Sequence, residues 1–184
     1  MQYLEDERFD NLSKLEIAEY NGCRFVNCDF ENKDFSRYLF IDCDFIDCNL
    51  SNSKLVDTAL KTVAFESCKL IGLDFTNCIP FLLKVTFLDC NLSYSSFYKM
   101  DLKATLFKNC LLNEVDFSNS NLTSALFDCS DLNRTVFDNT NLEKADLRTA
   151  KNFLIDPVNN KVKKALFLND NLSGLVAHFG VVIS

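Results

Sequence analysis

The chain has 184 residues, of which 48% are apolar and 24% charged, so its composition argues against disorder and fits one ordinary domain. Four glycines and two prolines leave no room for a glycine-rich phosphate loop. The formal net charge is −7, which argues against direct binding of nucleic acid or of an anionic membrane, because both favour a basic surface.

The nine cysteines and the first residues of the chain bear on its compartment. Nine is an odd number, the chain opens MQYLEDERFD without an apolar signal segment, and no apolar run approaches membrane-spanning length. We therefore expect a cytoplasmic protein with reduced thiols and no membrane attachment.

Large apolar residues recur at every fifth position in two long series of 12 and 13 members. The first series is Tyr20, Phe25, Phe30, Phe35, Phe40, Phe45, Leu50, Leu55, Leu60, Phe65, Leu70 and Phe75. The second is Phe87, Leu92, Phe97, Leu102, Phe107, Leu112, Phe117, Leu122, Phe127, Leu132, Phe137, Leu142 and Leu147. A mostly small residue, such as Cys23, Cys28 or Ser95, stands two positions before each member.

A period of five fits neither an α-helix nor a straight strand, since both would turn successive members to different sides. The chain must turn a corner every five residues so that each large side chain again points inward. The second series also alternates Phe and Leu, so one coil should hold a multiple of ten residues. Twenty residues, in a square coil, is the smallest such number that encloses a core, and like rings should then stack from coil to coil at about 4.8 Å.

This pattern resembles the tandem A(D/N)LXX motif of pentapeptide-repeat proteins, with close matches in CDF at 28–30, SNL at 120–122, SDL at 130–132 and ADL at 145–147. The resemblance implies an all-β fold, a right-handed quadrilateral β-helix with four pentapeptides per coil. We expect the β-helix within residues 1–150 and a C-terminal capping or dimerisation segment at 151–184.

The register breaks near residues 76–86, where Phe75 and Phe87 are twelve positions apart instead of ten. Pro80 stands where the next central residue is due, and proline cannot donate to a strand ladder. We expect a bulge or bend near Ile79–Pro80, with either a cis or a trans bond.

The C-terminal segment departs from the period of five. Leu172, Leu175, Val176 and Phe179 follow the spacing of a short helix, with Gly180 just past its end and the apolar tail Val181–Val182–Ile183 beyond. Such a segment caps the open coil end, and its apolar side chains are also candidate dimer anchors. Both roles stay open at this point.

The same segment indicates which subgroup of the family the chain resembles. The pattern IDP…N…KKA…F…GL…FGVVI resembles the C-terminal end of the pentapeptide-repeat subgroup that includes the quinolone-resistance proteins, the mycobacterial gyrase-inhibiting homologue and the microcin B17 immunity protein. The resemblance implies a homodimer joined through the C-terminal segments. It also implies an acidic, DNA-like rod that binds DNA gyrase or the related topoisomerase IV.

Catalysis and cofactor or metal binding are not expected. The chain has one histidine, His178, which lies off the apolar stripe of the terminal helix, and a packed coil offers no water-excluded pocket for a carboxylate pair. The spacing of Cys23 and Cys28, and of Cys43 and Cys48, is that of the repeat, and no histidine lies among them. Buried structural thiols are the expected state of every cysteine except Cys129.

The negative charge is concentrated in the first part of the chain. Residues 1–80 hold 15 acidic and 8 basic residues, a net of −7, whereas residues 81–184 hold 11 of each. A rod of about eight coils, roughly 38 Å long, carries about a third of the ~22 charges of B-DNA of that length. The candidates for a DNA-mimicking surface are outward aspartates on adjacent coils: Asp29, Asp34, Asp42, Asp44, Asp47 and Asp57.

The alternative function is a structural or adaptor rod that binds another protein. Outward apolar residues that should lie one above the other, Leu106 with Leu126 and Val26 with Ile46, would suit such a partner. A surface that is merely soluble is the third interpretation. Within the DNA-mimic interpretation, inhibition and protection stay open, because protective relatives project long loops and this chain inserts only two residues.

Overall fold

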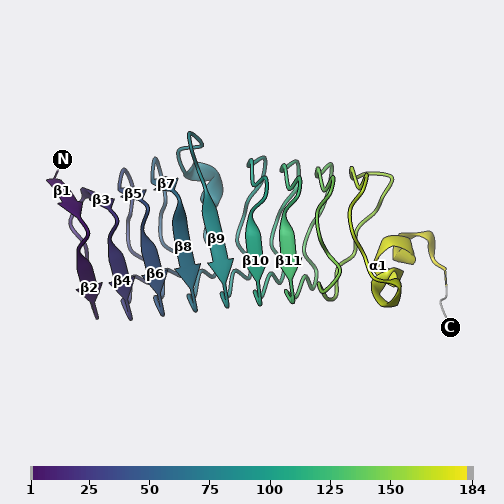
Figure 1. Ribbon diagram of the computed structural model, residues 1–184, viewed down its shortest axis with the longest axis horizontal. Helices are drawn as coiled ribbons and strands as arrows, with labels where there is room; N and C mark the ends of the chain where they lie inside the picture. The colour runs from purple at the N-terminus through teal and green to yellow at the C-terminus, as the bar shows by residue number, and fades with distance from the viewer. Residues whose placement is uncertain (1, 182–184) are drawn as a thin grey trace.

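The computed structural model describes residues 2–181 as a rod of stacked coils, with the N-terminus at one end and short helices at the other (Figure 1). The larger of two parallel sheets contains β2 (Arg8–Asp10), β4 (Arg24–Val26), β6 (Asp44–Ile46), β8 (Val63–Glu66), β9 (Val85–Leu88), β10 (Leu106–Lys108) and β11 (Leu126–Asp128). The smaller contains β1 (Gln2–Glu5), β3 (Ala18–Asn21), β5 (Leu39–Ile41) and β7 (Ala59–Lys61). The fold is the predicted right-handed quadrilateral β-helix.

Each coil has four sides, which we name after the central residues of one coil. Face A surrounds Phe25 and carries the larger sheet, face B surrounds Phe30, face C surrounds Phe35, and face D surrounds Phe40 and carries the smaller sheet. Isolated parallel bridges, such as Asp29 with Asn49, extend the pairing to the sides that lack named strands.

The pairing confirms the coil of twenty residues. Phe25 pairs with Phe45, and Phe107 with Phe127, and the rings of the latter pair stack with centroids 5.1 Å apart and an interplanar angle of 3°. All 25 members of the five-residue series are buried, with at most 8% of any residue exposed. Stacking of like rings along the rod therefore forms the core.

The corners explain why the period is five. With few exceptions, the second residue after each central one has a left-handed backbone, with φ near +55° to +70°. This conformation costs roughly 1–2 kcal/mol for most residues and suits Gly, Asn and Asp best. Asn27, Asn32 and Gly72 are corner residues of the favoured types.

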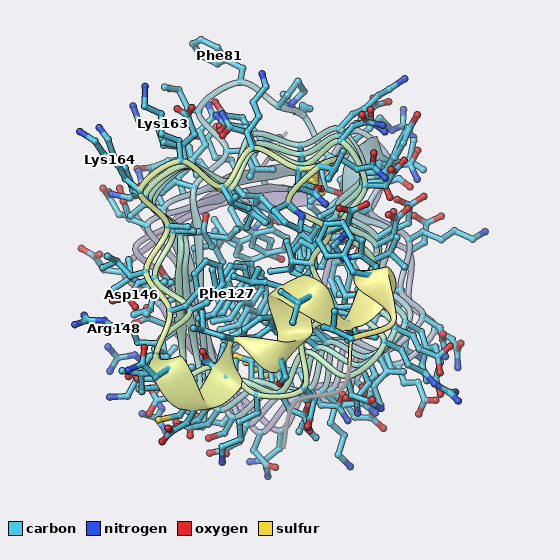
Figure 2. The ribbon with its side chains drawn as sticks, turned by 90° about the vertical axis from the view of Figure 1, so that its right-hand side faces the viewer. Phe81, Phe127, Asp146, Arg148, Lys163 and Lys164 are labelled. Carbon is cyan, nitrogen blue, oxygen red and sulfur yellow. The ribbon has the colours of Figure 1, made fainter. Side chains whose placement is uncertain are left out.

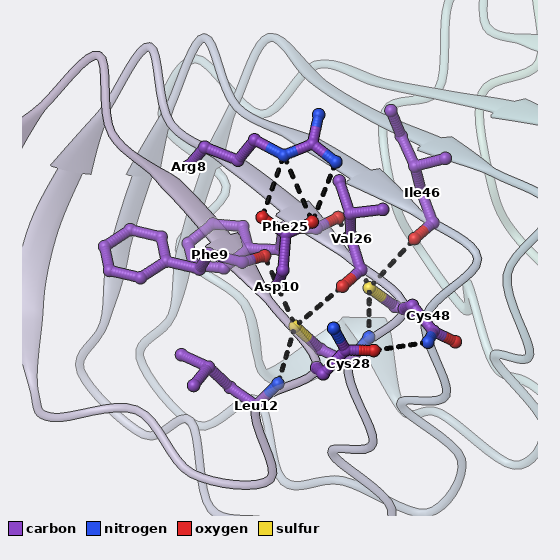
Figure 3. Close-up of polar contacts among 11 residues, drawn as sticks. Arg8, Phe9, Asp10, Leu12, Phe25, Val26, Cys28, Ile46 and Cys48 are labelled. Carbon is purple, nitrogen blue, oxygen red and sulfur yellow. Dashed lines mark hydrogen bonds and ion pairs between the residues drawn. The ribbon is translucent and has the colours of Figure 1, made fainter.

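Where the small residue two positions before a central one is Ser, Thr or Cys, its side chain forms hydrogen bonds with main-chain groups. Ser53 and Thr58 donate their hydroxyl groups to the carbonyls of Phe30 and Phe35, at 2.6 and 2.7 Å. The buried thiols occupy the same position, and Cys48 accepts the backbone N–H of Cys28 at 3.4 Å (Figure 3). Cys, Ser and Thr therefore satisfy main-chain groups between coils while remaining small enough to face the core.

The register break is a bulge on face D. A 3-10 turn, η1 (Phe75–Asn77), precedes it, Ile79 still pairs with Ala59, and the pairing resumes with Phe65 opposite Phe87. The two extra residues are accommodated in an outward loop at 80–84. The predicted bend is confirmed. Of the two geometries left open for the Ile79–Pro80 bond, the structure has the trans form, since residues 2–181 contain no cis peptide bond.

The coils extend at both ends. The first pairing has an offset of sixteen residues, with Arg8 opposite Arg24, so the shortened first coil begins at Gln2. At the other end Lys161 pairs with Asn141 and Leu166 with Asp146, so parallel pairing continues beyond residue 150. Whether 1–150 and 151–184 act as separate units stays a prediction.

The C-terminal end of the rod is covered by three short helical turns, η2 (Asn169–Asn171), α1 (Ser173–Val176) and η3 (Ala177–Phe179). Gly174 of α1 is buried against Phe153, where an added Cβ would clash with the Phe153 carbonyl oxygen. Gly180 has φ +67°, as expected for the residue that ends a helix. Val182 and Ile183 of the predicted apolar tail lie outside the described residues.

Candidate protein-binding surface

Many outward carboxylates and carboxamides first serve the turn of their own pentapeptide. In the repeat position before the central residue, the side-chain oxygen of Asp34 accepts the backbone N–H of Ser36 at 2.9 Å, and Asp116 accepts that of Ser118 at 2.8 Å. This hydrogen bonding with Ser36 lowers the pKa of Asp34. The D/N of the motif is thus a structural residue whose charge still faces solvent.

The six aspartates identified from the sequence all point away from the core but are distributed around the rod. They occupy face A with Asp44 and Asp47, face B with Asp29, face C with Asp34 and Asp57, and face D with Asp42. Three of them are corner residues with φ of +51°, +54° and +56°, namely Asp42, Asp47 and Asp57. The structure does not gather the six on one side.

Two of the six lie close together. Asp29 and Asp47 line a shallow hollow at the corner between faces A and B, beside Lys69, and Asn49 donates its side-chain amide to Asp29 at 3.2 Å. Asp44 is different, because the Arg24 guanidinium lies 3.0 Å from its carboxylate across one coil step. Asp29 and Asp47 therefore contribute more free negative charge than Asp44.

The four proposed dimer anchors differ in how far they are exposed at the C-terminal end of the rod. Leu172 and Phe179 are 40% and 59% exposed, whereas Leu175 and Val176 are half-buried. Leu175 packs against the core, so it covers its own coil. His178 lies 3.1 Å from Asp156, which ties the last helical turn to the rod.

Apolar side chains form a second candidate surface on face A. Leu106 pairs with Leu126 in adjacent strands, and both line a hollow of about 550 Å³ together with Leu168 (the left side of Figure 2, marked by Asp146 and Arg148). The charged rim of this hollow is internally neutralised, because the Arg148 guanidinium lies 2.7 Å from Asp146 and lowers the pKa of that carboxyl. This surface would suit an apolar partner.

Two of the buried thiols, Cys43 and Cys78, are unreactive near neutral pH. Burial raises the pKa of Cys43 and of Cys78 to about 12, so both stay protonated near neutral pH. Among residues 2–181 there is no group of three side chains that could hold a metal ion. In the same part of the chain, no helix combines the length and apolarity needed to span a membrane.

Two protein-family models match the chain. The model described as a pentapeptide repeat region matches residues 18–80, and the model of eight pentapeptide repeats matches residues 101–136 and 116–151. The chain belongs to the pentapeptide-repeat family. Between the matched stretches lie residues 81–100, which include most of the loop at the register break.

Among solved structures, this pentapeptide-repeat protein is similar to a trypsin-treated form of QnrB1, a plasmid-mediated fluoroquinolone resistance protein. The match covers 100% of this chain and 99% of that one, with 18% identity and a TM-score of 0.58. HetL, involved in heterocyst differentiation regulation in the cyanobacterium Nostoc, matches over 89% and 82% of the two chains, with 18% identity and a TM-score of 0.34. A comparison with curated protein sequences gives no match. At this identity the likeness to QnrB1 shows the fold alone.

Two features of the pentapeptide-repeat surface were missed from the sequence. The left-handed corners were not recognised, although Asn, Asp or Gly at the second position after many central residues is a readable signal. The distribution of charge among the four faces was also missed, because charge was counted along the chain and not around the coil.

Proposed function

We propose that this protein is a non-catalytic rod that binds a type II topoisomerase, DNA gyrase or topoisomerase IV, in competition with DNA. The observation that carries the proposal is an unbranched rod with outward carboxylates repeated at coil spacing, and with a net charge of −7 in residues 1–80. The C-terminal sequence pattern and the fold shared with a fluoroquinolone resistance protein support it. Such a partner places the protein in the cytoplasm.

The charge of the rod makes the contact sensitive to salt. Exposed carboxylates such as Asp29 and Asp47 act through water, where ionic screening is effective beyond about 8–10 Å. Binding to a basic topoisomerase surface should therefore weaken steeply as ionic strength rises. Both inhibition of the enzyme and protection from a quinolone or a gyrase-directed toxin are consistent with such competition.

The decisive experiment measures gyrase supercoiling and quinolone-induced cleavage with increasing protein. The test variant changes the six proposed aspartates to Asn, and the matched control changes six acids of the second half to Asn: Asp89, Asp101, Asp116, Asp128, Asp131 and Asp138. We expect the wild type and the control to act alike and the test variant to lose most of its effect. A wild type without effect on either reaction, or a fully active test variant, would falsify the proposal.

We also propose a homodimer joined through the C-terminal segments that contain Leu172, Leu175, Val176 and Phe179, with the exposed Leu172 and Phe179 in the contact and Leu175 covering its own coil. A two-fold contact uses one self-complementary patch, and the exposed Leu172 and Phe179 supply apolar area. Replacing Phe179 by Ser should yield monomers in light scattering at micromolar concentration, whereas Leu126→Ser on face A should not. A wild-type monomer, or a variant dimer of unchanged stability, rules out this interface.

A second candidate is an adaptor rod for a different protein, favoured by the hollow around Leu106, Leu126 and Leu168. An apolar contact of this kind should persist at high salt, in contrast to the DNA-like contact. Loss of partner capture from a bacterial lysate on Leu126→Ser, but not on the six-Asn change, would favour the adaptor.

A further inference from the structure

The lysines of this acidic protein are concentrated on one of its four sides. Seven of its 14 lysines lie on face D, from β7 to the C-terminal end. We call them the lysine face: Lys61, Lys84, Lys103, Lys144, Lys161, Lys163 and Lys164. On this stretch of face D, residues 58–62, 78–85, 100–104, 120–124, 140–144 and 160–164, the acids are Asp101 and Glu143, so the stretch has a net charge of 7 − 2 = +5.

The register of the coils places these lysines close together. Lys61, Lys84 and Lys103 line one hollow beneath the loop of the register break, together with Asp42 and Asp101. At the far end Lys161 pairs with Asn141, and the backbone N–H of Lys144 donates to the carbonyl of Lys163 at 3.0 Å. Seen along the rod, Lys163 and Lys164 project from the same upper side as Phe81, the tip of that loop (Figure 2).

The lysines are not neutralised by the protein itself. Among residues 2–181, none of the seven has a carboxylate oxygen within 4.0 Å of its ammonium group. Four of the five arginines, by contrast, pair with acids at 2.7 to 3.5 Å: Arg8, Arg24, Arg134 and Arg148. Most arginines of the other faces are therefore paired internally. In residues 2–181 the seven lysines of face D, like most lysines elsewhere, have no paired carboxylate, so the lysine face is distinguished by holding seven such charges on one side.

We propose that the lysine face binds the phosphate backbone of a nucleic acid. From Lys61 to Lys163 the stretch spans five coil steps, which is about 24 Å at ~4.8 Å a step. The side chains between the lysines on the central coil are small and polar, such as Thr123 and Ser124. Lysines and small hydroxyl groups are typical of phosphate contacts, which fix a duplex without reading its sequence.

A protein partner fits this surface less well. Protein interfaces have an apolar centre depleted in lysine. On the lysine face the exposed large apolar side chains are Phe81 and Leu82 of the loop at one end, and from Lys103 to Lys164 face D exposes none. The net charge of −7 does not oppose local binding, because screening limits the influence of acids on other sides to about 8 Å at physiological salt.

The experiment measures fluorescence anisotropy of a labelled 20-base-pair duplex with the full chain, in a salt series from about 50 to 200 mM. The test variant changes Lys144, Lys161, Lys163 and Lys164 to Gln. The charge-matched control changes four lysines of other faces to Gln: Lys33, Lys54, Lys69 and Lys99. Thermal unfolding of both variants checks that each one is folded.

We expect the wild type to bind with a log–log salt slope of about −4, for four to five phosphates at ~0.9 each. The test variant should bind at least ~10-fold more weakly with a shallower slope, and the control should stay within about threefold of wild type. Absence of duplex binding at about 50 mM salt, or equal weakening by both variants, overturns the proposal. Binding of polyglutamate without binding of the duplex overturns it in favour of an acidic protein. No topoisomerase is present, so the outcome is independent of the proposed function.

Discussion

The two halves of the rod use different residue types at their left-handed corners. In residues 18–79, eight of eleven left-handed corners are Gly, Asn or Asp, whereas in residues 85–147 only four of twelve are. The second half turns instead on residues such as Tyr94, Ala104 and Arg134. Since the left-handed conformation costs such residues roughly 1–2 kcal/mol each, the second half carries more backbone strain.

The comparison changes how the acidity of the first half is interpreted. Asp42, Asp47 and Asp57 occupy corners where Asp is favoured by backbone geometry, so part of the charge asymmetry is a by-product of turning the chain. The core does not separate the halves, because one column of stacked rings runs from Phe25 through Phe65 and Phe87 to Phe127. The halves therefore differ in the strain of their corners around a common core.

The largest expected effect tests the core of the second half. Phe107 is fully buried between Phe87 and Phe127, so Phe107→Ala should cost about 3–5 kcal/mol of unfolding free energy in denaturant titrations. Lys108→Ala, on the outward neighbour, should cost little. Equal tolerance of the two changes would contradict the inward assignment of the series.

Alkaline pH should destabilise the first half more, because the buried thiols Cys43 and Cys78 both lie there. Burial raises the pKa of Cys43 and Cys78 to about 12, so the folded state keeps protons that the unfolded state loses above about pH 8.5. Stability is therefore full below about pH 8.5 and falls as pH rises toward 12, by roughly 2 kcal/mol per thiol at pH 10. Cys78→Ala should flatten this fall and the exposed Cys129→Ala should not, as measured by unfolding at several pH values.

A glycine corner of the first half is expected to be intolerant. Gly72 has φ +69°, and an added Cβ would lie 2.6 Å from the Asn52 side-chain oxygen. Gly72→Ala should lower stability by about 1–2 kcal/mol from the backbone, with the clash in addition. Gly180→Ala is the control without a clash, since in the described part of the chain no atom beyond its chain neighbours lies within 4 Å of its Cβ position, and it should be milder.

Relieving a strained corner of the second half should stabilise the rod. Ala104 has φ +57°, and Ala104→Asn should raise the unfolding free energy by about 0.5–1 kcal/mol. Ala64, in β8, does not have a positive φ, so Ala64→Gly should lower stability by a similar amount. A decrease in thermal stability on Ala104→Asn would contradict the claim that the second half carries more strain at its corners.

The smallest expected effect tests whether the corner aspartates matter through their charge or through their backbone geometry. Changing Asp42, Asp47 and Asp57 together to Asn should alter stability by less than about 0.5 kcal/mol, because Asn accepts the left-handed corner as readily as Asp. A loss of gyrase binding in such a variant then reports charge alone. A clear drop in melting temperature would show that the carboxylates are needed for the fold.

The sequence predicted the interior of this protein far better than its exterior. Core positions such as Phe87 and Phe107 repeat at a period that only a cornered coil satisfies, so the fold followed from apolar spacing. The C-terminal end did not follow, because Asn152 and Pro157 interrupt the apolar series. Val162 and Phe167 then resume the series and pack against the core, beside the paired residues Lys161 and Leu166.

The candidate surface was predicted only in part. Outward slots are alternate positions in each pentapeptide, which the sequence reveals, but assigning Asp29 and Asp47 to a shared corner requires the structure. The pairing of Asp44 with Arg24 across one coil step was hidden by their separation of twenty residues. Counting charges along the sequence does not show which side chains form ion pairs between neighbouring coils.

Inward positions of this protein recur every five residues, whereas outward positions on the same side of the rod recur every twenty. Duplication of a single pentapeptide ahead of Lys144 would leave all later core residues in inward slots but rotate every later outward residue by a quarter turn. The lysines of face D would then continue on the adjacent side, in line with different neighbours. A fold of this kind can therefore exchange the chemistry of its sides in steps of 90°, by small in-frame insertions, without redesigning its interior.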